Sequence, residues 1–290
     1  MAIPTQPLAL VTGATSGIGE VTARELARQG YHVVLLARSA EKAARARQQM
    51  QALVGLGRRV DVLLCDLADL SQVRRAAAEF TQRYQRLDVL VNNAGRLFGQ
   101  PRQVSTAGIE LTLATNYLGP FLLTALLLQA LRQSPAARII NVASMAYKMA
   151  KPRLDDLHQE QDYSPLQQYS NTKLFNIMFT QELARQLRQR GIGNVVSNSL
   201  HPGAIASNFG AHAAGWLATG TQLLRPFMIS PDQGAETTLY LATAPEMGAI
   251  SGGFFAKKKA EPVKHDFNTA EHAWQLWQET QRLVHQNFFS

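Results

Sequence analysis

The sequence contains one cysteine, Cys65, among its 290 residues, and it lacks an apolar run as long as a membrane span. A single cysteine excludes an intrachain disulfide and a cysteine metal cluster, and it fits a reducing compartment. The longest apolar stretch, residues 117–131, is interrupted by Gly119 and Pro120 and is shorter than the roughly 20 residues that cross a bilayer. No basic and apolar leader pattern precedes Leu8. We therefore expect a cytoplasmic protein with no signal peptide and no membrane anchor.

Low-complexity tracts and internal repeats are missing too, and 46% hydrophobic with 17% charged residues is ordinary globular usage. The net charge is +8, but the basic residues are scattered, and the one dense run is 257–259. It is accompanied by no helix-turn-helix pattern, zinc spacing or cluster of basic and aromatic residues. Asp155, Asp156 and Asp162 are too dispersed for a metal site. We expect neither nucleic acid nor metal as a partner.

Apolar strands alternate with helical patterns along most of the chain, beginning with a strand at 8–11, a glycine turn and a helix that ends near Gly30. Continuous apolar strands indicate a parallel sheet that helices cover on both faces. No linker divides the chain, so we predict one doubly wound, mostly parallel, Rossmann-like α/β domain over residues 1–290. Further strands are predicted at 31–38, 59–67, 87–95, 137–144 and 194–203, and helices at 40–54, 71–84 (with Ser71 as N-cap), 109–131 and 169–190.

Two less regular segments, residues 146–168 and 204–230, each follow a predicted strand. In doubly wound sheets, ligands bind beyond the carboxyl ends of the strands. The second segment is apolar, with Phe209, Trp216 and Phe227 among its side chains. We expect these segments to line a pocket for an apolar small molecule.

The glycine turn TGATSGIG, residues 12–19, lies between the first strand and the first helix. Gly13, Gly17 and Gly19 permit a tight turn and a close approach of the backbone to a phosphate, and the helix N-terminus behind them favours anions. A glycine turn without a ligand is the alternative. The position in a βαβ unit favours a dinucleotide site.

Arg38 stands at the end of the second strand, where NAD enzymes carry the acidic residue that binds the ribose 2′-hydroxyl. A guanidinium suits a 2′-phosphate, because its planar fork forms paired charge-assisted hydrogen bonds. The sequence therefore predicts NADP(H), with a plain surface arginine as the alternative. Asp66 and the stretch from Asn92 to Gly95 supply short polar side chains and a glycine at the ends of the next two strands.

The segments TGATSGIG, NNAG, NVAS, YSNTK and HPG occur in the order and approximate spacing of the short-chain dehydrogenase/reductase superfamily. Over nearly its whole length the chain resembles the single-domain branch of that superfamily with the TGxxxGxG turn. CDLADLSQV, ATNYLGPFLLT and YSNTKLFNIMFTQELAR look most like the retinol-dehydrogenase-like group. The resemblance implies hydride transfer between a nicotinamide cofactor and a carbonyl or alcohol substrate.

The resemblance also implies site residues and an assembly. Relatives often pair into dimers or tetramers through the two long central helices, here about 109–131 and 169–190. Ala143 stands where the family often has a second serine. The implied catalytic residues are Asn116, Ser144, Tyr169 and Lys173, and the implied cofactor-binding residues are Gly13, Ser16, Gly17, Ile18, Gly19, Arg38, Asp66, Leu67, Asn93, Ala94, Gly95, Tyr169, Lys173, Pro202, Gly203 and Ser207.

Reducing a carbonyl requires a proton for the developing alkoxide, and the catalytic assignments fit this need. Tyr169 is a candidate acid, and Lys173, one helical turn later, is expected to lower its pKa from about 10. Ser144 can donate a hydrogen bond to the same oxygen. Burying the Asn116 amide in an apolar helix costs free energy unless the amide is hydrogen-bonded. The resemblance implies that Asn116 distorts the helix and holds a water molecule for a proton relay to the lysine.

Each of these residues alone also has a structural reading: a strand-end cap for Ser144, a satisfied core amide for Asn116 and a surface pair for Tyr169 and Lys173. Their joint order favours the enzyme. A light-dependent reductase of the protochlorophyllide type is an alternative, although Cys65 lies on the cofactor side. A non-catalytic NADP(H)-binding regulatory protein is another. His201 and His212 are alternative bases, for which a loop role is the simpler reading.

Overall fold

The computed structural model of the chain describes residues 6–55, 59–203 and 229–290. Helices and strands alternate as the sequence predicts up to residue 201. In chain order the elements are β1 (Leu8–Thr12), α1 (Gly17–Arg28), β2 (His32–Ala37), α2 (Ala40–Val54), β3 (Val60–Leu64), α3 (Leu70–Arg83), β4 (Val89–Asn92), α4 (Leu111–Leu113), η1 (Ala114–Leu118), α5 (Gly119–Arg132), β5 (Ala137–Val142), η2 (Met145–Met149), α6 (Pro165–Gln189), β6 (Val195–His201), α8 (Pro231–Thr243), η5 (Pro245–Gly248), β7 (Phe254–Ala256), β8 (Lys259–Ala260) and α9 (Ala270–Leu283).

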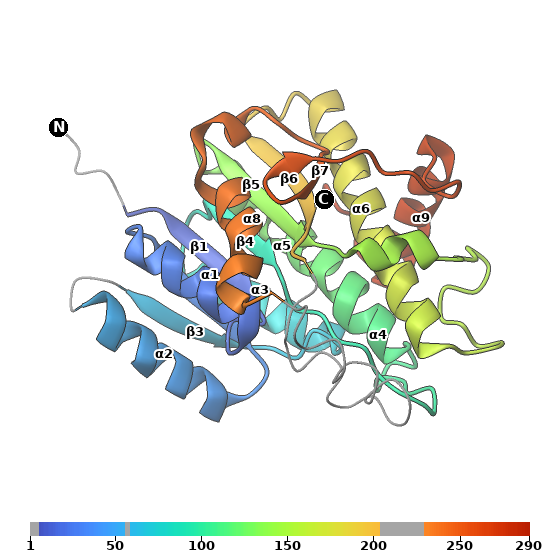
Figure 1. Ribbon diagram of the computed structural model, residues 1–290, viewed down its shortest axis with the longest axis horizontal. Helices are drawn as coiled ribbons and strands as arrows, with labels where there is room; N and C mark the ends of the chain where they lie inside the picture. Colours follow the sequence, from blue (N-terminus) through green and yellow to red (C-terminus); the bar gives the residue numbers. More distant parts are fainter. Residues whose placement is uncertain (1–5, 56–58, 204–228) are drawn as a thin grey trace.

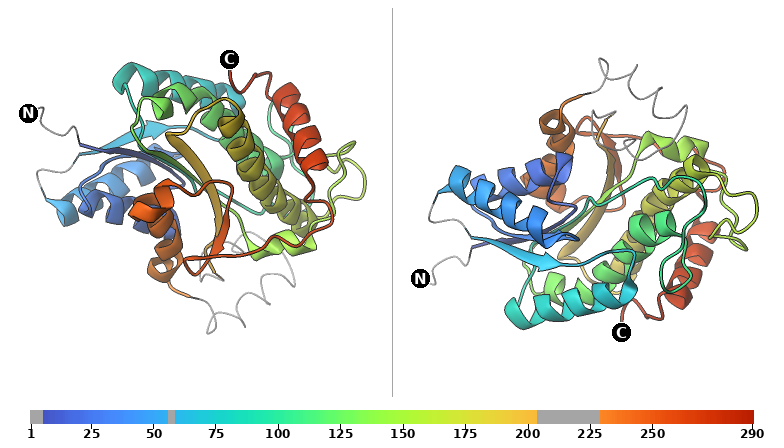
Figure 2. Two further views of the ribbon diagram at one scale, coloured as in Figure 1. Left: turned by 90° about the horizontal axis from the view of Figure 1, so that it is seen from above. Right: turned by 90° about the horizontal axis from the view of Figure 1, so that it is seen from below.

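One sheet of eight strands runs through the described part of the chain in the order β3-β2-β1-β4-β5-β6-β7-β8. All neighbouring pairs are parallel except β7 and β8, which form an antiparallel hairpin. Helices α1, α2 and α8 cover one face, and α3, α5 and α6 cover the other (Figures 1 and 2). The strand order reverses between β1 and β4, which is the place where doubly wound sheets bind their ligands. The predicted fold class is confirmed.

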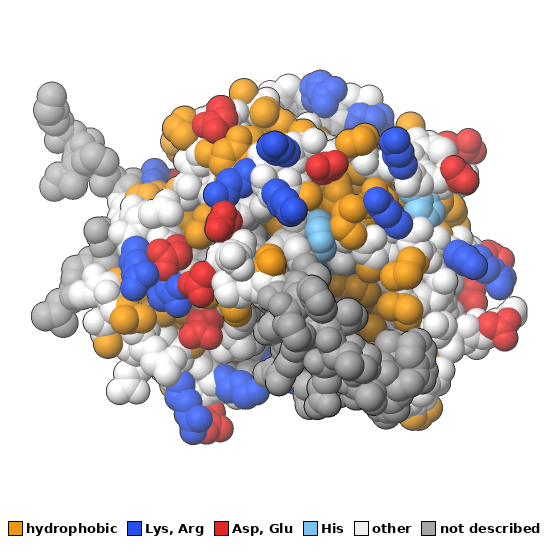
Figure 3. All heavy atoms as spheres, viewed as in Figure 1, with side chains coloured by type: hydrophobic (Ala, Val, Ile, Leu, Met, Phe, Trp, Pro, Cys, Tyr) orange, Lys and Arg blue, Asp and Glu red, His pale blue; other side chains and the backbone are white. Residues whose placement is uncertain are grey.

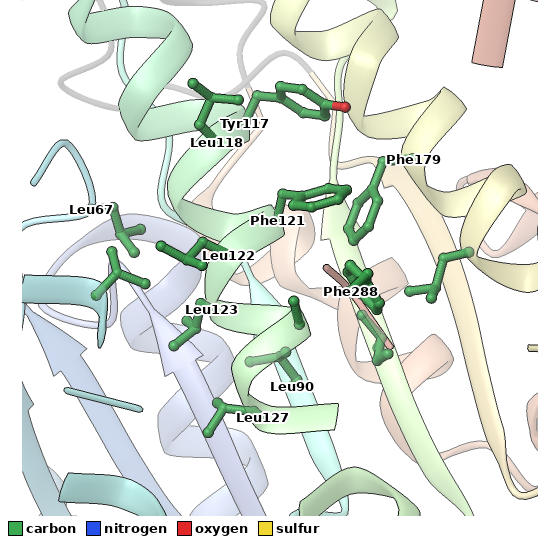
Figure 4. Packing of buried hydrophobic residues seen from close by; sticks show 14 of the residues in the cluster. Leu67, Leu90, Tyr117, Leu118, Phe121, Leu122, Leu123, Leu127, Phe179 and Phe288 are labelled. Carbon is green, nitrogen blue, oxygen red and sulfur yellow. The ribbon is translucent and has the colours of Figure 1, made fainter. Parts of the chain in front are cut away.

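The sheet separates two apolar cores, and the larger lies beneath α3, α5 and α6. Phe121 of α5, Phe179 of α6 and Phe288 near the C-terminus meet in it with ring centroids 5.1 to 5.9 Å apart (Figure 4). Aromatic pairs at this spacing add packing energy beyond the buried area. This core fixes α5 and α6 against the sheet and so sets the position of the residues at their ends.

Helices α3 and α6 begin earlier than the sequence pattern predicts. The N-cap of α3 is Asp69, whose carboxylate accepts hydrogen bonds from the backbone N–H groups of Ser71 and Gln72, so the prediction of Ser71 as the cap is wrong. An aspartate two positions upstream is an equally good cap and also carries the favourable negative charge. Helix α6 begins at Pro165, so Tyr169 lies one turn inside the helix.

The predicted helix 109–131 is interrupted. Residues Ala114–Leu118 form a π-helical turn between α4 and α5, in which the N–H of Gly119 donates to the carbonyl of Ala114, five residues back. Residues 111–132 are long and apolar enough to cross a bilayer by composition, but 83% of the most apolar window is buried inside the protein. The apolarity of this helix is accounted for by the core that it occupies.

Helix α9 packs against α6 (Figure 1), and aromatic side chains of the C-terminal segment reach α5. Trp277 of α9 is buried, and its ring centroid lies 5.1 Å from that of Phe121. The hydroxyls of Thr280 and Tyr117 are hydrogen-bonded at 2.8 Å. The expectation that two copies pair through the helices 109–131 and 169–190 stays a prediction.

Charged side chains on the face shown in Figure 3 are mixed in sign. Lysines and arginines lie over the β7–β8 hairpin and the segment after it, among acidic and hydrophobic side chains. The lysine run contributes to this group, and Lys258 is paired with Glu236 at 2.7 Å. The placement fits the scattered basic residues of the sequence, which are typical of a solvated surface.

Candidate active site

The predicted site residues that the structure describes lie at the carboxyl ends of β1 to β6 and on the neighbouring helices. Thr12, the last residue of β1, fastens this edge: its hydroxyl accepts the backbone N–H groups of Asn93 and Ala94 at 3.0 and 2.9 Å. The Asn93 side chain donates back to the Thr12 carbonyl at 2.9 Å. Sequence reasoning missed Thr12, although a threonine at a strand end before a glycine turn is a signal for such a clamp.

The glycine turn fits a dinucleotide pyrophosphate. Gly13 and Gly17 have φ of +65° and +57°, a conformation that side chains resist. A Cβ on Gly17 would meet nothing within 4 Å, so the space beside it is open. Ser16 is the N-cap of α1, yet its side chain makes no capping hydrogen bond, which leaves the first N–H groups of the helix available to an anion.

Arg38 and Asp66 lie side by side at the ends of β2 and β3, with the nearest charged atoms 3.8 Å apart. The Arg38 side chain is 61% exposed, so its guanidinium has room to bind a phosphate as well. Leu67, which the resemblance assigns to the cofactor, has its side chain in the core instead (Figure 4). Only the backbone of Leu67 is left for that role, because packing against α5 takes up the side chain.

Tyr169, Lys173 and Ser144 meet where α6 crosses the end of β5. The Lys173 ammonium lies 5.3 Å from the centroid of the Tyr169 ring and donates to the Val142 carbonyl at 3.0 Å. The Ser144 side chain hydrogen-bonds to the Tyr169 phenol. Tyr169 and Lys173 are 8% and 3% exposed, so the reading of them as an idle surface pair is wrong.

Burial controls the protonation of this pair. It raises the pKa of the Tyr169 phenol above its ordinary value, while the hydrogen bond with Ser144 acts in the opposite direction. It lowers the pKa of the Lys173 ammonium to about 8. The causes of this shift are burial and the Ser144 hydrogen bond. The expectation that Lys173 lowers the pKa of Tyr169 stays a prediction. The phenol is held protonated, as a proton donor must be.

Asn116 lies in the π-helical turn and is fully bonded. Its amide oxygen accepts the backbone N–H of Arg96 at 2.8 Å, and its amide nitrogen donates to the Arg96 carbonyl at 2.9 Å and to the Thr172 hydroxyl at 3.3 Å. A Cβ on Gly95 would lie 3.1 Å from the Lys173 nitrogen and 3.8 Å from the Asn116 amide oxygen. The two predicted residues thus meet across the backbone of Gly95, and the helix is distorted at Asn116 as expected.

Two polar residues, one half-buried and one fully buried, support the site. His201, at the end of β6, accepts the N–H of Met145 at its Nδ1 (3.3 Å), and burial lowers its pKa to about 4. It therefore braces the turn after Ser144 as a neutral acceptor, which favours the loop role over the base. Glu110 is fully buried, and its carboxylate accepts from the side chains of Tyr163 and Gln168. Glu110 ties segment 146–168 to α4, a role that nothing in the local sequence indicates.

The remaining predicted residues divide into two groups. Pro202 and Gly203 follow β6, and Gly203 has φ of +101°. Ile18 lies in the first turn of α1. Ser207, His212 and nearly all of segment 204–230 lie outside the described residues. Within the described ranges no cluster of three or more His, Cys, Asp or Glu side chains is arranged to hold a metal ion.

Comparison with known proteins identifies the family. A family model described as short chain dehydrogenase matches residues 7–217. The chain belongs to the short chain dehydrogenase family. Human retinol dehydrogenase 14 is 38% identical to it, in an alignment that covers 92% of this chain and 84% of that protein. Human retinol dehydrogenase 13 is 37% identical, with coverage of 95% and 83%.

Solved structures agree with the assignment to the short chain dehydrogenases. An uncharacterized protein from Mycobacterium paratuberculosis has a TM-score of 0.76 and 32% identity, and the match covers 98% of this chain and 97% of that one. A short chain dehydrogenase from Burkholderia cenocepacia in complex with NADP has a TM-score of 0.66 and 26% identity, with coverage of 86% and 94%. Membership of the family makes the chain an oxidoreductase with a nicotinamide cofactor.

Proposed function

We propose that this short chain dehydrogenase is an NADP(H)-dependent oxidoreductase that interconverts an apolar aldehyde or ketone with its alcohol. The observation that carries the proposal is the buried group of Tyr169, Lys173 and Ser144 beside the open glycine turn. A protonated phenol, a hydroxyl and an ammonium in a site sheltered from water are the groups that a carbonyl reduction uses. A binding protein without chemistry has no need to bury them together.

Each group has a defined part in the proposed reaction. The bound nicotinamide supplies the hydride for reduction or accepts it in oxidation. Tyr169 donates its phenolic proton to the carbonyl oxygen, and Ser144 donates a hydrogen bond to the same oxygen. Lys173 holds positive charge beside the phenol as the proton leaves, which stabilises the negative charge that develops there. The glycine turn binds the pyrophosphate, and Arg38 binds the 2′-phosphate.

The apolar substrate class rests on the segments around the site and on the relatives. Several relatives are named retinol dehydrogenases. In segment 146–168, the apolar side chain of Met149 is 51% exposed. Retinaldehyde and long-chain aldehydes are therefore the first compounds to test.

The cofactor preference is tested by replacing Arg38. In Arg38→Ala, the KM for NADPH is expected to rise about 10- to 10²-fold while the KM for NADH changes little, because only the 2′-phosphate loses a charge-assisted partner. Arg45→Ala is the matched control, since Arg45 is an exposed arginine on α2 that is paired with Glu41. A wild type that prefers NADH, or an Arg38→Ala variant unchanged toward NADPH, contradicts the assignment.

The pH dependence follows from the lysine. As pH rises through about 8, Lys173 loses its charge in the unliganded protein, whereas the raised pKa of Tyr169 keeps the phenol protonated. Since kcat/KM for NADPH reports the groups of the free enzyme, it is expected to be level below about pH 7 and to fall above about pH 8. A profile that stays level to pH 10 speaks against this role of Lys173.

The proposed activity is tested by following NADPH oxidation at its absorbance band across a panel of carbonyl compounds, in darkness and in light. Turnover in darkness with apolar aldehydes is the expected result. Turnover only in light identifies a protochlorophyllide-type reductase, a result at odds with the position of Cys65, whose thiol is buried in the core with its pKa raised to about 12. Tight NADPH binding with no turnover of any compound identifies a regulatory protein and refutes the proposal.

A further inference from the structure

The backbone carbonyl of Asn116 cannot accept the hydrogen bond that a regular α-helix provides. In a regular helix, this oxygen accepts the N–H of the residue four positions later. That residue is Pro120, which has no N–H. Asn116 is also 1% exposed, so solvent does not replace the missing donor. A buried carbonyl is costly to leave unpaired, so a side chain that donates to it is stabilising.

Asn176 of α6 supplies that hydrogen bond. Its side-chain amide nitrogen donates to the Asn116 carbonyl at 3.1 Å, in a contact that is buried on both sides. Asn176 is 5% exposed, and its own backbone carbonyl accepts from the Thr180 hydroxyl. The contact crosses from one helix to another, so it ties the π-helical turn to α6 in a way that no hydrogen bond within α5 could.

This tie leads directly to the catalytic lysine. Thr172 and Asn176, four residues apart on α6, hold the side chain and the backbone of Asn116. The Asn116 side chain in turn holds both backbone groups of Arg96. The preceding residue is Gly95, against which the Lys173 ammonium lies. The position of that backbone relative to Lys173 thus depends on where α6 holds Asn116.

We propose that Asn176 is a positioning residue for catalysis: by supplying the hydrogen bond that Pro120 cannot, it fixes Asn116 and the Gly95–Arg96 backbone against Lys173. The inference rests on the proposed function for its catalytic consequence. Its structural part, the placement of Asn116, stands on the hydrogen bonds alone. Asn176 touches no reacting atom, and its effect passes through Asn116.

The first test is Asn176→Ala, measured by hydrogen exchange and by turnover. The Arg96 amide, which donates to the Asn116 side chain, is expected to exchange at least about 10-fold faster, because its acceptor is no longer held. The kcat with NADPH is expected to fall about 10- to 10²-fold, as misplacement by about 1 Å can cause. The pH at which kcat/KM for NADPH falls to half is expected to differ from that of the wild type. Gln186→Ala is the matched control, because Gln186 is a buried α6 amide that donates to Glu182 away from the site.

A second variant separates positioning from simple stability. Pro120→Ala restores a backbone N–H that can donate to the Asn116 carbonyl within its own helix. In the double variant Asn176→Ala with Pro120→Ala, the melting temperature is expected to recover while turnover and Arg96 exchange stay impaired, because the tie to α6 is still missing. Recovery of all three shows that Asn176 only satisfies a carbonyl and overturns the inference.

The outcomes also distinguish the two proposals. If the wild type turns over no carbonyl compound, the proposed function fails, and the exchange of the Arg96 amide still decides whether Asn176 positions Asn116. If the wild type is active and Asn176→Ala lowers only the melting temperature, as Gln186→Ala does, the inference fails and the proposed function stands.

Discussion

Replacing Tyr169 with phenylalanine is expected to lower the kcat of carbonyl reduction by about 10²- to 10⁴-fold, the range lost with a general acid. The ring and its packing are kept, and only the hydroxyl that carries the proton is removed. The loss is expected in kcat, because Tyr169 acts on the oxygen on which charge develops. NADPH binding, measured by fluorescence titration, is expected to stay within about 3-fold of the wild type, because the glycine turn and Arg38 are untouched.

Tyr147→Phe is the control for this variant. Tyr147 is a buried tyrosine of η2, three residues after Ser144, and its ring packs against Phe254. It loses the same oxygen atom close to the site but outside the catalytic group, so its kcat is expected to stay near that of the wild type. A Tyr169→Phe variant with turnover within about twofold of the wild type excludes the phenol as the acid.

Alanine substitutions at Gly19 and at Gly17 are expected to differ in their effects on stability and on NADPH binding. Together they test whether the glycine turn binds the cofactor. A Cβ on Gly19 would lie under 3.0 Å from the Asn93 amide nitrogen and from the Gly13 carbonyl. Gly19→Ala is therefore expected to lower the free energy of unfolding by about 3 kcal/mol, at the upper end of overpacking costs. Because the turn itself is displaced, NADPH binding is expected to weaken as well.

Gly17→Ala meets no atom of the protein and bears only the cost of its left-handed backbone, about 1 to 2 kcal/mol. Its methyl group projects into the open space beside the N-terminus of α1. We therefore expect its NADPH Kd to rise at least about 10-fold with a smaller loss of melting temperature than in Gly19→Ala. Thermal unfolding and NADPH titration of both variants check this. If Gly17→Ala binds NADPH as tightly as the wild type does, the pyrophosphate does not bind at this turn.

The sheet and the helices that build the cofactor side could be predicted from the sequence, because their signals are local. Buried parallel strands are apolar throughout, and glycines that directly follow such a strand indicate a turn. The errors also have local causes. Asp69 and Ser71 are both good caps, so composition alone does not choose between them. The π-helical turn could not be read from periodicity, although Pro120 in the middle of an apolar helix marks the place where a helix must change.

The features that escaped prediction depend on contacts between distant residues. Thr12, Glu110 and Asn176 act through partners 53 to 82 positions away in the sequence. The packing of α9 against α6 could not be predicted for the same reason. The sequence of an apolar helix face does not show whether the face packs against the same chain or against a second copy. The pKa of Tyr169 is a third case, because the spacing of the sequence indicates a nearby lysine but not the burial that raises this pKa.

Transfer of deuterium from NADPH labelled at both C4 positions is the most direct test of the central claim. The wild type is expected to convert an apolar aldehyde to an alcohol that mass spectrometry finds heavier by one deuterium, and Tyr169→Phe is expected to do so at least about 10²-fold more slowly. An alcohol without deuterium, or equal label transfer by the variant, would contradict the proposal that Tyr169 protonates a carbonyl that the nicotinamide reduces.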